Sequence, residues 1–201
     1  MSDIVVRQVL DSDLHSIAVI HKGQFGGHFL GKFSVALLTK FYRAFLEDSI
    51  FLIAENLDEP AGFVLGGEAV RLTARKKQFL TSDLGRLILE SAVRPRLWGM
   101  VISRLFSLGP RGSQPVSGYE MRLLSIAVDD DSKGKGVASA LVAEFEKSLT
   151  GYREYGLSVL ADNSRAVAFY RKTGYTEEMR RGKSVYFFKT LPEDPVTRGK
   201  S

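Results

Sequence analysis

A glycine-rich turn with two lysines is the part of the sequence best suited to bind a phosphorylated ligand. It reads Lys133-Gly134-Lys135-Gly136-Val137-Ala138 and follows an apolar run that ends at Val128. Glycines let the backbone approach a ligand closely, and the start of a helix presents N–H groups with a partial positive charge. We therefore predict that a pyrophosphate binds this turn. A solvated basic turn without a ligand is the alternative.

A second group of residues recurs at helical spacing further along the chain. Asn163, Ala166 and Tyr170 are separated by three and four positions, so a helix over 164–173 places them on one face. This face then carries a polar amide, a small side chain that leaves space beside the helix, and a phenol. An isolated aromatic at this spacing is more often a core residue, and a core tyrosine is the alternative.

Two better-known phosphate motifs do not fit the glycine-rich turn. A nucleotide-hydrolysing loop needs Gly-Lys-Ser/Thr, whereas Gly136 is followed by Val137-Ala138. A dinucleotide fingerprint needs a third glycine where the chain has Ser139. The turn also comes late in the chain, after several strands that we expect to be antiparallel.

Together, the two segments resemble the GNAT superfamily, the acyl-CoA-dependent N-acetyltransferases. The family signature Gln/Arg-x-x-Gly-x-Gly/Ala overlays residues 133–138, with Lys133 in the place of Gln or Arg. Lysine keeps the charge but lacks the planar fork of arginine. The family's next motif matches Asn163 to Tyr175, and the resemblance covers residues 119–190. It implies acetyl transfer from acetyl-CoA to a primary amine by direct attack in a ternary complex.

The resemblance also implies roles for individual residues. It implies that Asn163 hydrogen-bonds to the pantetheine arm of the cofactor and that the small side chain of Ala166 leaves room for this arm. It also implies that the Tyr170 hydroxyl protonates the leaving thiolate. In similar folds a bulge separates the strand that ends at Val128 from the strand at 157–160, and the pantetheine arm of the cofactor lies in that opening. The expected cofactor-binding residues are Ile126, Ala127, Val128, Lys133, Gly134, Lys135, Gly136, Val137, Ala138, Asn163, Ala166 and Tyr170.

The base that deprotonates the amine is harder to identify. Glu120 is the best carboxylate, because it stands early on the strand that ends at Val128, and Glu68 is the second choice. A solvated, non-catalytic Glu120 and a water relay are the alternatives. The three histidines of the chain are too far apart in the sequence to predict a metal site. They are His15, His21 and His28.

Composition excludes several classes of protein. The 201 residues contain no cysteine, which rules out disulfide frameworks, thiolate zinc sites and cysteine nucleophiles. No basic, apolar leader begins the chain, and no apolar run is long enough to cross a membrane. We expect a cytoplasmic protein. The formal charge of +5 is compatible with an anionic partner without selecting one.

The pattern of apolar residues predicts an α/β (α+β) fold, and the resemblance implies that this fold is GNAT-like. Its central mixed, mostly antiparallel sheet is flanked by helices, with a helical insertion between the third and fourth strands. Residues 1–191 form one domain, and 192–201 form a flexible tail. Strands are expected at 4–10, 50–55, 62–67, 119–128, 157–160, 175–179 and 184–190, and helices at 14–21, 34–48, 72–80, 84–93, 97–108, 137–149 and 164–173.

The insertion, residues 70–118 with its loop, carries most of the excess charge. Residues 71–111 contain nine Lys or Arg against two acidic residues, a local +7. We favour an amphipathic cover for the sheet, with a lid, a homodimer surface or a membrane-facing ledge as alternatives. A non-catalytic module that docks on nucleic acid or an acidic membrane through these helices is the alternative function, although we do not expect a nucleic-acid partner. The acceptor would be a small-molecule or peptide amine. A co-substrate with an acyl group larger than acetyl is an alternative donor.

Overall fold

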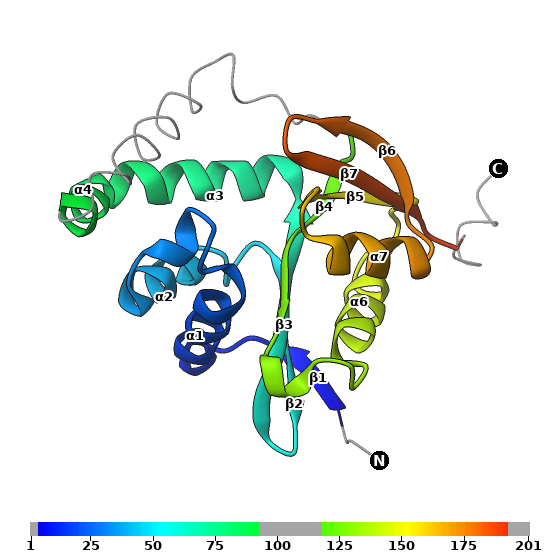
Figure 1. Ribbon diagram of the computed structural model, residues 1–201, viewed down its shortest axis with the longest axis horizontal. Helices are drawn as coiled ribbons and strands as arrows, with labels where there is room; N and C mark the ends of the chain where they lie inside the picture. Colours follow the sequence, from blue (N-terminus) through cyan, green and yellow to red (C-terminus); the bar gives the residue numbers. More distant parts are fainter. Residues whose placement is uncertain (1–3, 93–117, 193–201) are drawn as a thin grey trace.

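The computed structural model describes residues 4–92 and 118–192, which form one seven-stranded sheet with helices on both sides (Figure 1). The strand order is β1-β2-β3-β4-β5-β7-β6, and every neighbouring pair is antiparallel except β4 and β5. The predicted mixed, mostly antiparallel sheet is confirmed, and the strand predicted at 119–128 is the central one. The strands are β1 Ile4–Gln8, β2 Ile50–Asn56, β3 Glu59–Glu68, β4 Met121–Val128, β5 Glu154–Leu160, β6 Thr176–Arg181 and β7 Ser184–Thr190.

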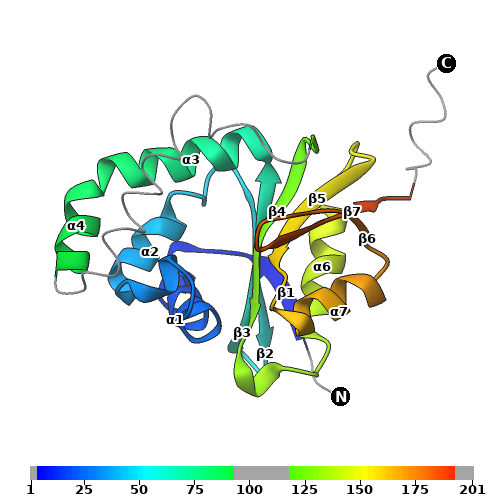
Figure 2. The same ribbon diagram turned by 45° about the horizontal axis from the view of Figure 1, so that its top comes forward.

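The helices form a layer on each face of the sheet, with α1 to α4 on one side and α6 and α7 on the other (Figure 2). Of the predicted insertion, α3 and α4 lie between β3 and β4 as expected. The helix predicted at 97–108, most of the loop at 109–118 and the tail beyond 192 lie outside the described residues. The helices are α1 Leu14–Phe25, α2 Val35–Arg43, α3 Ala69–Ser82, α4 Leu84–Ala92, α6 Val137–Lys147 and α7 Ser164–Lys172, with short 3-10 turns at Asp11–Asp13, Leu30–Lys32 and Asp130–Ser132.

Two hydrophobic cores lie on opposite faces of the sheet. Side chains alternate between the faces along β3, so Phe63 and Leu65 pack with α1 to α4 while Val64 packs with α6 and α7. Leu72 of α3 and Leu87 of α4 are buried in the first core. These two helices of the insertion therefore cover the sheet, as the amphipathic pattern predicts.

The central strand β4 changes its pairing half-way along its length. Leu65 of β3 pairs with Ser125 and the next residue of β3 with Leu123, so Leu124 forms a bulge. Pairing between β4 and β5 covers only Met121 to Leu123. Beyond the bulge, β4 and β5 separate, and the second half of β4 has a neighbour on one side only.

A glycine allows the close packing at this bulge. A Cβ atom on Gly66 would lie 2.5 Å from the ring of Phe145 in α6 and 2.6 Å from the carbonyl oxygen of Arg122. Neither group can move away cheaply, because one is a buried ring and the other is backbone of the central strand. Only glycine fits here without a shift of β4 or α6.

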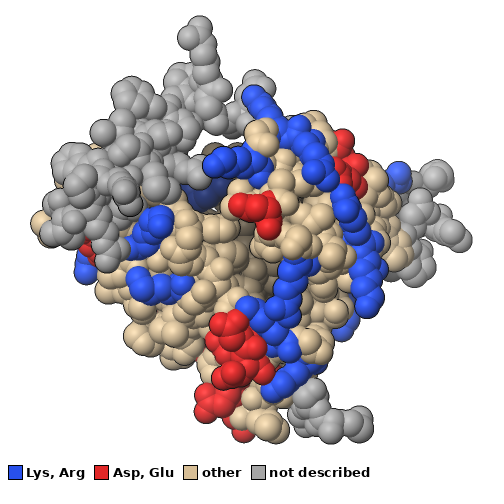
Figure 3. All heavy atoms as spheres, in the orientation of Figure 1, with Lys and Arg blue, Asp and Glu red and all other residues tan. Residues whose placement is uncertain are grey.

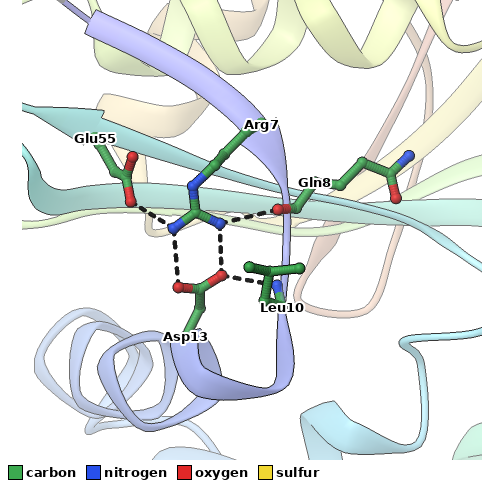
Figure 4. Close-up of polar contacts among 5 residues, drawn as sticks. All are labelled: Arg7, Gln8, Leu10, Asp13 and Glu55. Carbon is green, nitrogen blue, oxygen red and sulfur yellow. Dashed lines mark hydrogen bonds and ion pairs between the residues drawn. The ribbon is translucent and has the colours of Figure 1, made fainter.

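An ion-pair network fixes the first strand to the helical layer (Figure 4). The guanidinium of Arg7 in β1 donates to both oxygens of Asp13, at 2.7 and 3.0 Å, and to Glu55 of β2. Asp13 also accepts from the backbone N–H of Leu10, at 2.7 Å. The Arg7 guanidinium lowers the pKa of Asp13, so this carboxylate stays charged at neutral pH.

Candidate active site

The separation of β4 from β5 leaves backbone groups of β4 without partners. Asp129 donates its N–H to a carbonyl of β3, at 2.9 Å. Backbone groups of alternate residues point to the same side of a strand, so those of Ala127 also face β3 and those of Ile126 and Val128 face the opening. Of the three β4 residues predicted to bind the cofactor, Ile126 and Val128 expose peptide groups to the opening. The side chain of Ala127 is instead buried in the first core.

The glycine-rich turn continues this line of unpaired backbone groups. Gly134 and Gly136 have φ angles of +80° and +90°, which favour glycine. A Cβ atom on Gly134 would contact nothing within 4 Å, so the turn is open. Helix α6 begins directly after Gly136 and has no side-chain cap, which leaves the first N–H groups of the helix, including those of Val137 and Ala138, without a partner in the described chain. An anionic group fits this turn.

The lysines and aspartates around the turn have different roles. Lys133 pairs with Asp130, and this ion pair lowers the pKa of the Asp130 carboxyl. The carboxylate of Asp129 accepts from the N–H of Asp131 at 3.2 Å and so stabilises the short turn before the glycines. Lys135 is exposed. The aspartates therefore stabilise the turn, and its backbone and Lys135 are available to a ligand, whereas Lys133 is paired with Asp130.

The predicted face of α7 is present in the structure. Asn163 caps the helix, because its side-chain oxygen accepts from the N–H of Ala166 at 3.1 Å. The amide NH2 of Asn163 donates to no other described residue. Ala166 is partly buried against the second core and Tyr170 is buried there. Gly174 ends the helix with a φ of +87°, as predicted for a left-handed cap.

The phenol of Tyr170 is held in its neutral form by burial. Its ring is only 5% exposed and packs against Tyr175 and Phe187, with centroid distances of 5.0 and 5.8 Å. Burial raises the pKa of Tyr170 well above the usual value of about 10. No described residue hydrogen-bonds to the hydroxyl, yet it is not among the fully buried polar atoms that lack a partner. The hydroxyl therefore reaches the surface of the core.

The two candidate bases lie away from the opening. Glu120 is exposed and precedes the first residue of β4, at the end where β4 and β5 pair. Glu68 ends β3 and pairs with Arg71 at 2.8 Å. In the described chain, no group of three or more His, Cys, Asp or Glu side chains is placed to hold a metal ion.

The charge distribution agrees with an anionic ligand in this half of the molecule. On the face shown in Figure 3, Lys and Arg side chains gather over the half that carries α7 and the β6–β7 hairpin, and acidic side chains cluster at the lower edge. In the insertion, by contrast, Arg75 pairs with Asp48 and Arg71 pairs with Glu68. Part of the excess charge of the insertion is therefore used within the fold.

Comparison with known proteins identifies the family. The model of the acetyltransferase (GNAT) family matches residues 24–175, which is most of the chain. The chain belongs to the GNAT acetyltransferase family. The resemblance of the two motifs is thereby confirmed, as is acetyl-CoA as the co-substrate, because enzymes of this family use it as the acetyl donor. Transfer to an amine acceptor is the general activity of the family.

Solved structures of GNAT proteins share the fold at low sequence identity. The crystal structure of SsHAT has a TM-score of 0.70 at 20% identity, over 94% of this chain and 99% of that one. PaiA N-acetyltransferase from Thermoplasma acidophilum, solved in complex with coenzyme A, has a TM-score of 0.56 at 16% identity, with the same coverage of 94% and 99%. N-acetyltransferase from Staphylococcus aureus Mu50 has a TM-score of 0.62 at 15% identity, over 93% and 100%. A search of curated proteins gave no match.

None of the helices within residues 4–92 and 118–192 combines the length and the apolar character that a membrane span requires.

The resemblance implies a bulge in the strand that ends at Val128, but the sequence alone did not place it at Leu124 and did not single out Arg122. Bulges have no fixed residue pattern, and Arg122 stands in a run that otherwise predicts an ordinary buried strand. The chain marks the bulge on the neighbouring strand, where Gly66 and Gly67 follow one another. A glycine pair in an apolar strand is the signal that could have located it.

Proposed function

We propose that this GNAT protein transfers the acetyl group of acetyl-CoA to a primary amine, by direct attack of the amine in a ternary complex. The observation that carries the proposal is the unpaired half of β4, which leads into the open turn at Gly134 and Gly136 on the side where Tyr170 holds a neutral phenol. A binding site, an anion site and a proton donor thus belong to one region of the sheet.

The backbone supplies most of the binding in this proposal. When bound, acetyl-CoA supplies an acetyl group activated as a thioester. Peptide groups of Ile126 and Val128 bond the pantetheine arm, and one of their N–H groups donates to the thioester carbonyl oxygen, where negative charge develops. The turn at residues 133–138 holds the phosphates with its N–H groups and with the charges of Lys133 and Lys135. The Asn163 amide, free on its NH2 side, donates to the arm.

Tyr170 acts as the general acid. A leaving thiolate needs a proton, and an acid is useful only while it is protonated at the working pH. The raised pKa of Tyr170 meets this condition, since burial keeps its hydroxyl neutral throughout the physiological range. The hydroxyl has no competing partner in the described chain, so it is available to the sulfur atom.

We also propose Glu120 as the base that accepts the proton of the amine. Four residues separate it from the bulge at Leu124, a distance of roughly 13 Å along an extended strand. At that distance the carboxylate accepts the amine proton only through bridging waters. Its exposure leaves it free to do so.

Two measurements test the function. Calorimetric titration with acetyl-CoA measures binding, and release of free thiol across a panel of amines measures transfer. We expect saturable binding and amine-dependent thiol release. Absence of binding at millimolar acetyl-CoA would overturn the proposal, and tighter competition by longer acyl-CoA esters would replace acetyl as the donor.

A further inference from the structure

The sheet has a second face beside the opening that the described helices leave uncovered. Leu157 of β5 and Phe187 of β7 point into the core with α6 and α7, so alternation turns Ser158, Tyr186 and Phe188 to the opposite face. The core beneath α1 to α4 contains no residue of β5, β6 or β7. Tyr186 and Phe188 are only half-buried there. This part of the sheet is a partly exposed aromatic surface.

Arg122 lies at the inner edge of this aromatic surface. Met121 and Leu123 point into the core with α6 and α7, which turns the side chain of Arg122 to the same face as Tyr186. Its neighbours in register are glycines on both sides, Gly67 on β3 and Gly156 on β5. No side chain of the flanking strands therefore stands directly beside it.

Tyr119 completes the wall of this site. Its ring stacks on Phe188, with centroids 5.5 Å apart and planes at 16°. A Cβ atom on Gly156 would lie 2.6 Å from the Tyr119 ring, so only glycine in β5 lets the ring lie flat against the sheet. The arrangement leaves an arginine bordered by three aromatic side chains.

The guanidinium of Arg122 has no partner within the described chain. It takes part in none of the hydrogen bonds or ion pairs there, although Glu178 and Tyr186 are near enough to influence it. The side chain of Arg122 is half-buried, so its charge is partly removed from water, and this burial lowers its pKa. A partly buried charge without a hydrogen-bonded partner costs free energy, and an incoming anion with matching geometry offsets that cost.

The location connects this charge to the reaction. Arg122 precedes the bulge at Leu124 by two residues, roughly 7 Å along the strand, and the unpaired groups of β4 begin at that bulge. A molecule that binds Arg122 with one end therefore presents its other end near the opening. This part of the sheet lies on the face opposite α7, which carries Tyr170. Acceptor and co-substrate thus have separate approaches.

We propose that the acceptor is an amine that also carries a carboxylate, which Arg122 binds while Tyr119, Tyr186 and Phe188 form the surface against which the rest of the molecule packs. Arginine suits this role because its planar fork matches the two oxygens of a carboxylate. The inference rests on the proposed transfer to an amine and specifies the chemical class of its acceptor.

The experiment compares amines in matched pairs that differ only in the carboxylate. Glycine, β-alanine, γ-aminobutyrate and L-phenylalanine are each tested against the amine left after loss of the carboxyl group, which are methylamine, ethylamine, propylamine and phenethylamine. Free-thiol release gives kcat and KM, and calorimetry on the CoA-bound protein gives binding without turnover. We expect at least one amino acid to exceed its partner amine roughly 10- to 100-fold in kcat/KM, as a charge-assisted bidentate contact contributes.

Variants assign the preference to the guanidinium. Arg122→Gln is expected to raise KM for the preferred amino acid roughly 10- to 100-fold, with little change for its partner amine. Arg122→Lys restores only part of the preference, because lysine lacks the fork. Arg153→Gln is the matched control, since Arg153 is exposed on the loop before β5. Unchanged acetyl-CoA binding verifies that each variant is folded.

The outcomes separate this inference from the proposed function. Equal kcat/KM within every pair, equal loss on both members in Arg122→Gln, or a preference for O-phosphoethanolamine over every amino acid would overturn the carboxylate assignment, while transfer itself stands. Absence of thiol release with all amines contradicts the proposed function. In that case Arg122-dependent binding of an amino acid still supports the anion site, and absence of such binding overturns it.

Discussion

The Nδ1 atom of His21 lies 2.5 Å from the hydroxyl of Tyr42, and both side chains are buried between α1 and α2. The side chain of Ser125, the residue of β4 that follows the bulge, lies near enough to the Tyr42 hydroxyl to lower its pKa, against the larger opposing effect of burial. The other ring nitrogen of His21 is buried without a partner in the described chain. The buried His21–Tyr42 pair therefore joins α1 to α2 and lies beside the central strand at the position where its pairing changes.

Burial of this imidazole makes stability depend on pH. Burial, with a smaller contribution from His28, lowers the pKa of His21 from 6.5 to about 4. Between these values the unfolded chain binds a proton that the folded chain does not, so stability falls as the pH falls. We expect a loss of about 2 kcal/mol between pH 7 and pH 5 from this group. Urea unfolding of His21→Gln at both pH values checks this, since that variant should lose the dependence and exposed His15→Gln should keep it.

Removing Arg7 from its ion-pair network and removing Arg43 from its ion pair with Asp11 should lower the stability by unequal amounts. Both interactions involve an aspartate of the 3-10 turn Asp11–Asp13. Arg7→Gln leaves the largely buried carboxylates of Asp13 and Glu55 without their cation, and we expect a loss of about 1–3 kcal/mol. Arg43→Gln removes a bidentate pair with Asp11 that is exposed on both sides, and we expect a much smaller loss. Denaturant unfolding measures both. Equal losses would contradict the role given to burial.

Gly136 should be critical for co-substrate binding rather than for folding alone. Gly136→Val places a branched side chain at a φ of +90° beside the N–H groups of α6, and we expect acetyl-CoA affinity to fall at least tenfold. Gly151→Val is the control, because Gly151 has a φ of +85°, open space around it and a place outside the turn. Calorimetry on both variants, with thermal unfolding to compare the strain, distinguishes binding from backbone conformation.

Loss of the Tyr170 hydroxyl should affect turnover alone. Tyr170→Phe keeps the packed ring, so we expect kcat to fall roughly 10²- to 10⁴-fold with acetyl-CoA affinity nearly unchanged. Tyr175→Phe is the matched control, because the Tyr175 hydroxyl bonds that of Tyr155 within the core. That variant should lose stability and keep kcat. Turnover by Tyr170→Phe at the normal rate would remove Tyr170 from the mechanism.

Glu120 has a smaller predicted effect because of its distance from the bulge. If its carboxylate accepts the amine proton through water, Glu120→Gln reduces kcat/KM most strongly at low pH, where free amine is scarce. Glu154→Gln, another exposed glutamate near the start of a strand, should leave the pH profile unchanged. Identical pH profiles of Glu120→Gln and the native protein would show that water alone relays the proton.

Local patterns were enough to predict most elements of the sheet and the residues of the turn. Ser34 caps α2 by accepting from Leu37, as its position before an apolar helical stripe predicts. The mixed, mostly antiparallel character of the sheet follows from the resemblance to the family. Asn163, Ala166 and Tyr170 share one face because helical spacing alone determines it.

Features that depend on tertiary contacts could not be predicted. The first hairpin turns where the sequence predicts, at residues 57–60, but the positive φ angles of Leu57 and Asp58 could not be predicted, because such a turn is normally marked by Gly or Asn. Strand β5 starts three residues earlier than expected, because Gly156 breaks the apolar pattern and is required only by the ring of Tyr119. The partnerless state of Arg122 likewise depends on side chains that are far away in sequence.

The single-sided pairing of Leu124–Val128 gives the centre of this sheet the properties of an edge strand. Exposed edges pair readily with extended segments of other chains, and proteins usually protect them. Here the protection would come from the pantetheine arm, which in effect occupies the place of a missing strand. We therefore expect protein freed of coenzyme A to self-associate more readily than the bound form, so that a co-substrate of catalysis also serves as a safeguard against aggregation.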